Sequence, residues 1–176
     1  VDHLWALPML CDHVAAKWGH EPLTVVSPDS GRVRVADIWA DRLGAPLAIV
    51  HKRRDPDVPN QVTAHELVGD VAGRTCLLVD DMIDTAGTIV AAAAALKKNG
   101  AARVIVAATH AIFSDPAVER LSSEAVDAVV VTNTLPVGPD KQFDKLEVLS
   151  IAPLIAKAIS AVFDDDSVNS LFPGHA

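Results

Sequence analysis

Short runs of β-branched and aliphatic residues alternate with helical patterns along almost the whole chain, and this alternation limits the possible folds more than any other feature. The runs expected to form strands are 23–27, 47–50, 75–79, 103–108, 128–132 and 147–151. Helical patterns cover 7–17, 32–43, 89–99, 116–122 and 152–163. Parallel strands need crossover connections, usually helices, so this order is typical of a helix-covered parallel sheet. We therefore predict an α/β fold with a mainly parallel, twisted sheet and helices on both faces.

The size and charge of the chain exclude several classes of protein. With 176 residues, 50% of them apolar, we expect one packed domain with at most an appendage. The net charge is −8 and Lys52–Arg54 is the only basic cluster, which argues against a binder of duplex nucleic acid. The longest apolar run, 89–96, is far short of the roughly 20 residues that cross a bilayer. Because only two cysteines occur and no secretory leader is visible, we expect a cytoplasmic protein.

A polar stretch, Lys52–Gln61, follows the second expected strand and contains two prolines. It has neither the period of a helix nor that of a strand. We therefore predict an exposed, mobile loop at this point.

The residues after the strand 75–79 have the richest chemistry of the chain. Two carboxylates, Asp80 and Asp81, can accept hydrogen bonds from the vicinal hydroxyls of a sugar and help to hold a hydrated Mg²⁺. A turn of small and hydroxylated residues then opens a helix, whose unpaired N–H groups and dipole favour a phosphate. That turn consists of Asp84, Thr85, Ala86, Gly87 and Thr88. The segment thus predicts a cradle for a sugar phosphate.

Other interpretations of this segment are weaker. No Gly-Lys-Ser/Thr and no Gly-x-Gly-x-x-Gly is present, which removes the main support for an NTPase or a dehydrogenase. A paired-acid turn with Asp84 or Thr85 as helix cap, or a receiver-like acidic pocket, would fit the carboxylates. Neither explains the small-residue half, Thr85–Thr88.

The segment Asp80–Thr88 resembles the PRPP-binding loop of the type I phosphoribosyltransferase fold. Ordered motifs at other strand ends extend the likeness, so that the chain from Val1 to Phe172 resembles the ribose-phosphate pyrophosphokinase family. These motifs are 26–32, 49–54, 108–110 and 149–154. Proteins of that family are about twice this long, and the chain is similar to their C-terminal half. The resemblance therefore implies a phosphoribosyltransferase-like sheet.

The resemblance also implies a role for each matching residue. Lys52 and Arg54 would be the catalytic cations, and Asp29 would bind a metal. Asp80 and Asp81 would bind the ribose hydroxyls. The 5-phosphate would be held by Asp84, Thr85, Ala86, Gly87 and Thr88.

The implied reaction transfers the β,γ-diphosphoryl group of ATP to O1 of ribose 5-phosphate, with Mg²⁺, and yields PRPP and AMP. Ser167 and Phe172 would line an allosteric site for inorganic phosphate or ADP. The family's hexamers imply a homo-oligomer, and neither nucleic acid nor membrane is an expected partner.

The resemblance divides the chain into three parts. Residues 1–22 would connect it to a missing N-terminal domain, 23–163 would form the phosphoribosyltransferase-type domain, and 164–176 would be a polar tail. Because the family's adenine site lies in the missing half, we expect the isolated chain to be inactive.

Two alternatives remain at this point. A type I phosphoribosyltransferase that consumes PRPP would use the same loop, but it would need a hood segment over a base, and none is visible. A non-catalytic regulatory relative is also possible, although the retained Asp29, Lys52 and Arg54 argue against it.

Overall fold

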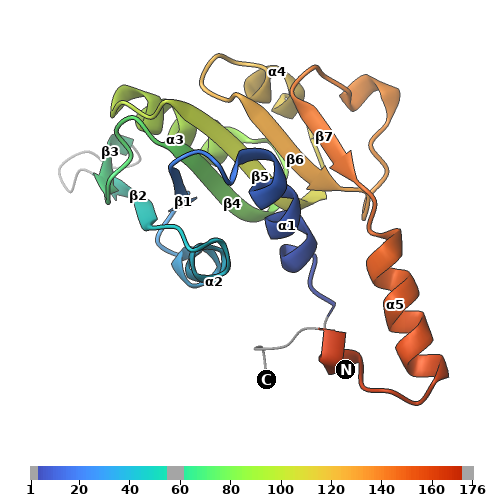
Figure 1. Ribbon diagram of the computed structural model, residues 1–176. Coiled ribbons are helices and arrows are strands. Elements are labelled where there is room, and N and C mark those ends of the chain that lie inside the picture. The colour runs from blue at the N-terminus through green and yellow to red at the C-terminus, as the bar shows by residue number, and fades with distance from the viewer. Residues whose placement is uncertain (1–3, 55–61, 172–176) are drawn as a thin grey trace.

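The computed structural model describes residues 4–54 and 62–171. Their strands form one sheet in the order β3-β2-β1-β4-β5-β6-β7 (Figure 1). The strands are β1 Leu23–Ser27, β2 Leu47–Arg54, β3 Val62–Val68, β4 Thr75–Ile83, β5 Arg103–Ala111, β6 Ala128–Thr132 and β7 Leu146–Leu149. All neighbouring pairs are parallel except β2 and β3, which are antiparallel. The predicted mainly parallel α/β sheet is confirmed.

Helices cover both faces of the sheet, as the sequence predicts. They are α1 Leu7–Trp18, α2 Val33–Leu43, α3 Gly87–Lys98, α4 Ala117–Leu121 and α5 Ala152–Phe163, with short 3₁₀ turns η1 Pro139–Lys141 and η2 Val168–Leu171. Leu77 and Val79 of β4 pack in a cluster with α1 and α2. Cys76 and Leu78 pack in a second cluster with α3 and α4. Alternate residues of a central strand thus bury their side chains against opposite helix layers.

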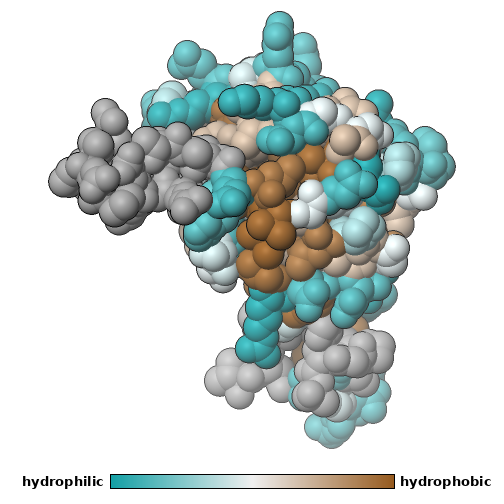
Figure 2. Space-filling view, turned by 90° about the vertical axis from the view of Figure 1, so that its left-hand side faces the viewer, coloured by the Kyte–Doolittle hydropathy of each residue, from teal (hydrophilic) through white to brown (hydrophobic). Residues whose placement is uncertain are grey.

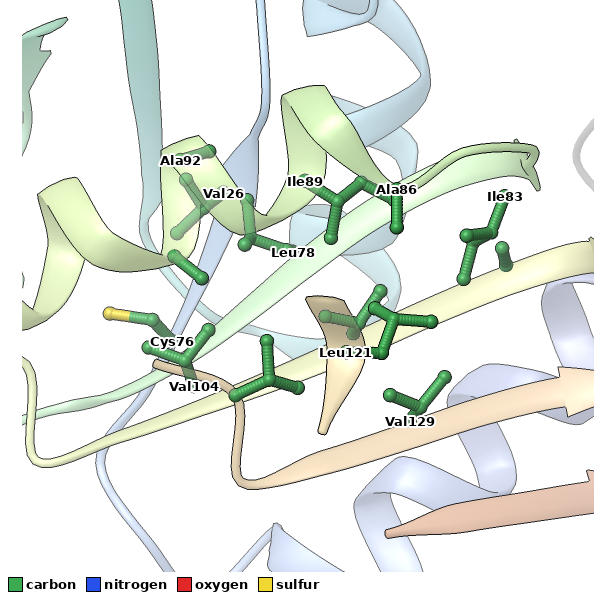
Figure 3. Packing of buried hydrophobic residues seen from close by; sticks show 14 of the residues in the cluster. Val26, Cys76, Leu78, Ile83, Ala86, Ile89, Ala92, Val104, Leu121 and Val129 are labelled. Atoms are coloured by element: carbon green, nitrogen blue, oxygen red, sulfur yellow. The ribbon is translucent and has the colours of Figure 1, made fainter. Parts of the chain in front are cut away.

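Helix α3 is fixed to the sheet by its apolar side, as Figure 3 shows. Ile89, Ala92 and Leu96 are buried in the same cluster as Leu78 and Val104. Its many alanines favour the helix and add little side-chain bulk, so the helix can pack closely on the strands. The start of α3, where the candidate phosphate loop lies, is therefore anchored to the core.

Helix α1 belongs to the same packed unit. Leu10, Val14 and Trp18 are buried against the sheet and α2. On its exposed side His13 Nε2 lies 3.0 Å from Glu147 Oε2 of β7, and Lys17 also pairs with Glu147. These contacts join the beginning of the described chain to the last strand.

Helix α5 lies apart from the sheet, extending away from it in Figure 1. It packs with Leu4, Trp5 and η2 in a small cluster of its own, while Phe163 is 87% exposed. Figure 2 likewise shows apolar side chains reaching the surface in the middle of one face, surrounded by polar ones. Despite these apolar surfaces, none of the helices in the described ranges is both long and apolar enough to cross a membrane.

Several expectations about strands were wrong, including that of a last strand over 147–151, which is observed as Leu146–Leu149. The predicted loop Lys52–Gln61 is strand as far as Arg54, because β2 continues and pairs with β3, a strand that the sequence did not predict. Residues 55–61 lie outside the described ranges. Strand β4 does not end before the acidic residues but runs to Ile83, because β5 also continues to Ala111 and pairs with it along the whole length.

Candidate functional site

The candidate site lies where the carboxyl ends of the parallel strands meet. Strand β1 pairs in parallel with β2 on one side and β4 on the other, so their ends share one edge of the sheet. Ligands of open α/β sheets bind at this edge. Asp29, which follows β1, and the carboxylates at the end of β4 are thus brought to the same edge.

The turn that carries Asp29 is held by its own hydrogen bonds. Ser27 Oγ donates to the Asp29 carbonyl at 2.7 Å, and Asp29 Oδ1 accepts the N–H groups of Gly31 and Arg32 at 2.8 and 3.1 Å. A Cβ on Gly31 would lie only 3.2 Å from that Oδ1, so the turn favours glycine there. Both N–H groups use one oxygen, and Oδ2 takes no part in the turn.

Asp80 and Asp81, here called the acidic pair, are bridged by a cation that sequence analysis missed. Arg32 Nε lies 3.3 Å from Asp80 Oδ1, and its Nη2 donates to Asp81 Oδ1 at 2.7 Å. The Asp81 N–H also donates to Asp80 Oδ1 at 2.8 Å. Arg32 lies in the turn that follows β1, and it reaches Asp81, 49 positions away, because β1 and β4 are neighbours in the sheet.

The two carboxyl groups of the acidic pair titrate in opposite directions. Burial, together with the hydrogen bond between the two side chains, raises the pKa of Asp80 to about 6. Partial burial opposes the ionisation of Asp81, but the hydrogen bonds with Asp80 and Arg32 hold its pKa below the usual range. At neutral pH Asp81 is therefore ionised, and Asp80 is mostly ionised.

Residues 84–88, here called the phosphate loop, comprise the connection after β4 and the first two residues of α3. Together with Asp80, Met82, Ile83 and Ile89 they line a cavity of about 170 Å³. Ala86 has a left-handed backbone, with φ of 59°, and a buried methyl group beside Ile83 and Ile89 (Figure 3). Helix α3 begins at Gly87, and the N–H groups of a first helical turn have no partner within the helix. The cavity therefore has the backbone donors and small side chains that suit a phosphate.

A larger cavity of about 430 Å³ borders the acidic pair. Its walls are mainly apolar, with Trp39 among them, and His110 lies at its edge. The sequence left open whether His110 bonds a neighbouring loop or a ligand. The structure shows that its Nδ1 lies 2.9 Å from Thr134 Oγ1, while the residue also lines this cavity.

The other predicted site residues lie on β2 and near η2. Lys52 and Arg54 lie in the last part of β2, where the backbone pairs with His65 and Val62 of β3. Ser167 is exposed just before η2. Phe172 lies outside the described residues.

No group of three or more His, Cys, Asp or Glu side chains that could hold a metal occurs within the described residues. Mg²⁺ is commonly bound through only one or two carboxylates together with water and substrate phosphates. Asp29, with Oδ2 not used in its own turn, fits such a sparse site. The buried thiols are poor ligands, because burial raises the pKa of Cys11 to about 12 and that of Cys76 to about 11.

Comparison with known proteins links this geometry to one family. The model of the phosphoribosyl synthetase-associated domain matches residues 56–173. Ribose-phosphate pyrophosphokinase of Streptomyces coelicolor is 65% identical over 172 residues, which cover 98% of this chain and 53% of that protein. The chain thus spans about half the length of the curated relatives it matches.

Solved structures agree with this match. The crystal structure of phosphoribosylpyrophosphate synthetase from Mycobacterium smegmatis superposes with a TM-score of 0.86 at 51% identity, over 94% of this chain and 53% of that one. Orotate phosphoribosyltransferase from Aeropyrum pernix has a TM-score of 0.56 at 19% identity, over 86% of this chain and 73% of that one. The second likeness shows a shared fold only.

Proposed function

The chain belongs to the family of the phosphoribosyl synthetase-associated domain, and on that premise we propose that it binds ribose 5-phosphate for a ribose-phosphate pyrophosphokinase reaction. In that reaction O1 of ribose 5-phosphate forms a bond to the β-phosphorus of ATP. The bond from that phosphorus to the oxygen shared with the α-phosphate breaks, AMP leaves with this oxygen, and the O1 proton is released. The relatives that are identical to this chain at more than half of the aligned positions are named for this activity.

One observation carries the proposal: the phosphate loop and Asp80 line a single cavity. Its volume of about 170 Å³ is below the ~300–1,000 Å³ of drug-sized pockets, in keeping with one phosphate and the adjoining part of a sugar. The N–H groups and hydroxyls of Thr85 and Thr88 would donate to the 5-phosphate. The acidic pair, a few residues before the loop, would accept hydrogen bonds from the ribose hydroxyls.

Charge balance supports the assignment of the ribose end. Two adjacent carboxylates repel each other, and Arg32 compensates this repulsion by pairing with both. The ionised groups can then point acceptor oxygens at a neutral sugar. Asp29 is connected to this end through the backbone N–H of Arg32, so the three carboxylates form one connected group.

Diphosphoryl transfer needs positioned charge more than covalent catalysis. Lys52 and Arg54, at the end of β2 on the same sheet edge, would pair with the negative charge on the group in transfer. Mg²⁺, held by Asp29 and the phosphates of ATP, would neutralise further charge when bound. This half of the site would also have to exclude water, because water competes with O1 for the diphosphoryl group.

The other half of the relatives' length is expected to supply adenine recognition and further metal ligands. On this proposal the chain alone forms no PRPP, because ATP is held too loosely for transfer. Homo-oligomer formation, a cytoplasmic location and an effector site for inorganic phosphate or ADP at Ser167 and Phe172 stay predictions.

Calorimetry on the chain and a fusion to the missing half test the proposal. We expect the chain to bind ribose 5-phosphate, and the fusion with the remaining half of the Streptomyces coelicolor relative to release AMP only when ribose 5-phosphate is present. In that fusion Lys52→Ala and Arg54→Ala should lower kcat by orders of magnitude with little change in ribose 5-phosphate affinity. No detectable binding by the chain would contradict the proposed ribose 5-phosphate site. Robust PRPP formation by the chain alone would contradict only the expectation that ATP binding needs the other half.

A further inference from the structure

Arg120 of α4 lies against the phosphate loop, although 35 positions separate it from its partner. Its Nη1 donates to the Thr85 carbonyl at 2.8 Å. A Cβ built on Gly87 would lie 3.4 Å from the same nitrogen. The guanidinium group therefore covers one side of the loop and the first residue of α3.

The short helix that carries Arg120 is fixed in place. Ala117 and Leu121 are buried in the same cluster as Ile89 of α3 (Figure 3 labels Leu121 and Ile89). Just beyond α4, Lys145 Nζ donates to three carbonyls at 3.1, 2.8 and 2.7 Å, those of Ser122, Ser123 and Val126. The position of Arg120 relative to the loop is thus set by packing on one side of α4 and by these hydrogen bonds after its end.

The hydrogen bond to Thr85 has a consequence for the next residue. In a planar trans peptide the carbonyl and the following N–H point in opposite directions. When Arg120 holds the Thr85 carbonyl toward α4, the N–H of Ala86 points to the other side of that peptide. Ala86 also has a left-handed backbone, a conformation that is strained for a residue other than glycine. A fixed partner for the preceding carbonyl helps to maintain this strained turn.

Charge gives the contact a second role. Asp80 and Asp84 line the same cavity as the phosphate loop, so a phosphate bound there meets two carboxylates nearby. The dipole of α3 supplies only about half an elementary charge at its N-terminus. Lys97 and Lys98 lie at the far end of α3. The guanidinium group of Arg120 supplies a full positive charge beside Gly87.

We propose that Arg120 is a positioning residue for the 5-phosphate of ribose 5-phosphate: it orients the Thr85–Ala86 peptide for the phosphate and adds positive charge beside Gly87. This inference rests on the proposed function of the phosphate loop. It extends the site to α4, an element to which the sequence resemblance assigns no role.

Three substitutions at this exposed position separate the hydrogen bond and charge from the packing of the side chain. Calorimetry with ribose 5-phosphate should show about a tenfold loss of affinity for Arg120→Met and Arg120→Gln, and about a threefold loss for Arg120→Lys, which keeps the charge and one donor. The loss in Arg120→Met should shrink at high salt, where the charge of the wild-type side chain is screened. Arg42→Ala, at an exposed arginine paired with Asp12 on another face, should bind like the wild type.

The outcomes distinguish this inference from the function it rests on. The role of Arg120 would be overturned if Arg120→Met bound ribose 5-phosphate as tightly as the wild type, or if all three variants lost affinity equally, without rescue by lysine. Either result would leave the proposed function intact as long as the wild type binds ribose 5-phosphate. Failure of the wild-type chain to bind ribose 5-phosphate would overturn both. Because Arg120 is exposed, thermal melting should show that all three variants are folded. If the methionine variant does not fold, the difference in ribose 5-phosphate affinity between the lysine and glutamine variants tests the role of Arg120.

Discussion

The phosphate loop and the acidic pair are close in sequence, the pair near the end of β4 and the loop at the start of α3, but different interactions determine their geometry. In the loop the backbone sets the geometry, through the left-handed Ala86, its buried methyl group and the start of α3 at Gly87. In the acidic pair charged side chains set it, through the two contacts of Arg32 with Asp80 and Asp81. The backbone therefore orients the N–H donors of the loop in advance, whereas the strength of the acidic pair as hydrogen-bond acceptors depends on the ionisation of its carboxyl groups.

On the proposed function, this difference suits the two regions to separate tasks. A phosphate needs donors that are fixed before it arrives, and backbone N–H groups at a helix start need little rearrangement to bind it. Ribose hydroxyls need acceptors, and a carboxylate is a stronger acceptor when ionised. We therefore expect the loop to respond to changes of shape and the pair to changes of charge.

The largest effect is expected from a change of shape in the loop. Gly87→Val places a branched side chain where even a Cβ lies 3.4 Å from Arg120 Nη1, and it blocks close approach of the phosphate to the helix start. Affinity for ribose 5-phosphate in calorimetry should fall at least 100-fold, or about 2.7 kcal/mol. The matched control Ala94→Val adds the same side chain to an exposed position of α3 and should bind normally. Normal binding by Gly87→Val would place the phosphate elsewhere.

A smaller effect is expected from removing charge at the acidic pair. The double substitution Asp80→Asn and Asp81→Asn keeps the shape but weakens the acceptors, so ribose 5-phosphate should bind about 30-fold more weakly. Binding of inorganic phosphate should not weaken, because the loop is unchanged and the negative charge of Asp80 is removed from the same cavity. Asp37→Asn with Asp41→Asn on α2 is the matched control for net charge. An equal loss for inorganic phosphate would show that the two regions do not act separately.

The same difference explains how much of the site could be predicted from sequence. The phosphate loop is local, since five consecutive residues with the right sizes and hydroxyls follow a strand, and its identification needs no knowledge of the sheet order. The contacts of Arg32 with Asp81 and of Arg120 with Thr85 join residues 49 and 35 positions apart. Such contacts form only between elements that are neighbours in the fold, and a single sequence does not specify which elements are neighbours.

The errors in the predicted strands have a similar cause. Strands β1 and β6 lie inside the sheet, are almost entirely buried and rich in valine, and were predicted with the correct bounds. Strand β3 lies at the edge of the sheet, includes polar residues such as Glu66, and was missed. Asp80 and Asp81 suggested a strand end, although pairing with β5 keeps β4 extended as far as Ile83. Neighbouring strands thus decide extension where the local sequence is ambiguous.

The folding stability of the protein should depend on pH through the acidic pair. The pKa of Asp80 in the folded state is about 6, above its ordinary value of 3.8. Between these two pH values the folded state therefore retains a proton that the unfolded chain releases. Folding stability contributed by this group is present below about pH 4 and falls as the pH rises to about 6, by at most about 3 kcal/mol. Asp80→Asn removes this cost, so urea unfolding should show a gain of about 1–2 kcal/mol at pH 7.5, after the lost Arg32 contact, and no gain near pH 4. The same change at both pH values would exclude the titration of Asp80 as the cause.

The smallest effect is expected at Thr88, where the proposed phosphate site would use a side chain in addition to the backbone. Thr88 is the second residue of α3, is half-buried and lines the cavity, so its hydroxyl can donate to the phosphate. Thr88→Val keeps the shape and removes that donor, and calorimetry should show about a fivefold loss of ribose 5-phosphate affinity, or about 1 kcal/mol. Thr88→Ser keeps the donor and should bind nearly as the wild type does. Equal affinity of the valine and serine variants would mean that the Thr88 hydroxyl does not bind the phosphate, and the loop would then depend still more on its backbone N–H groups.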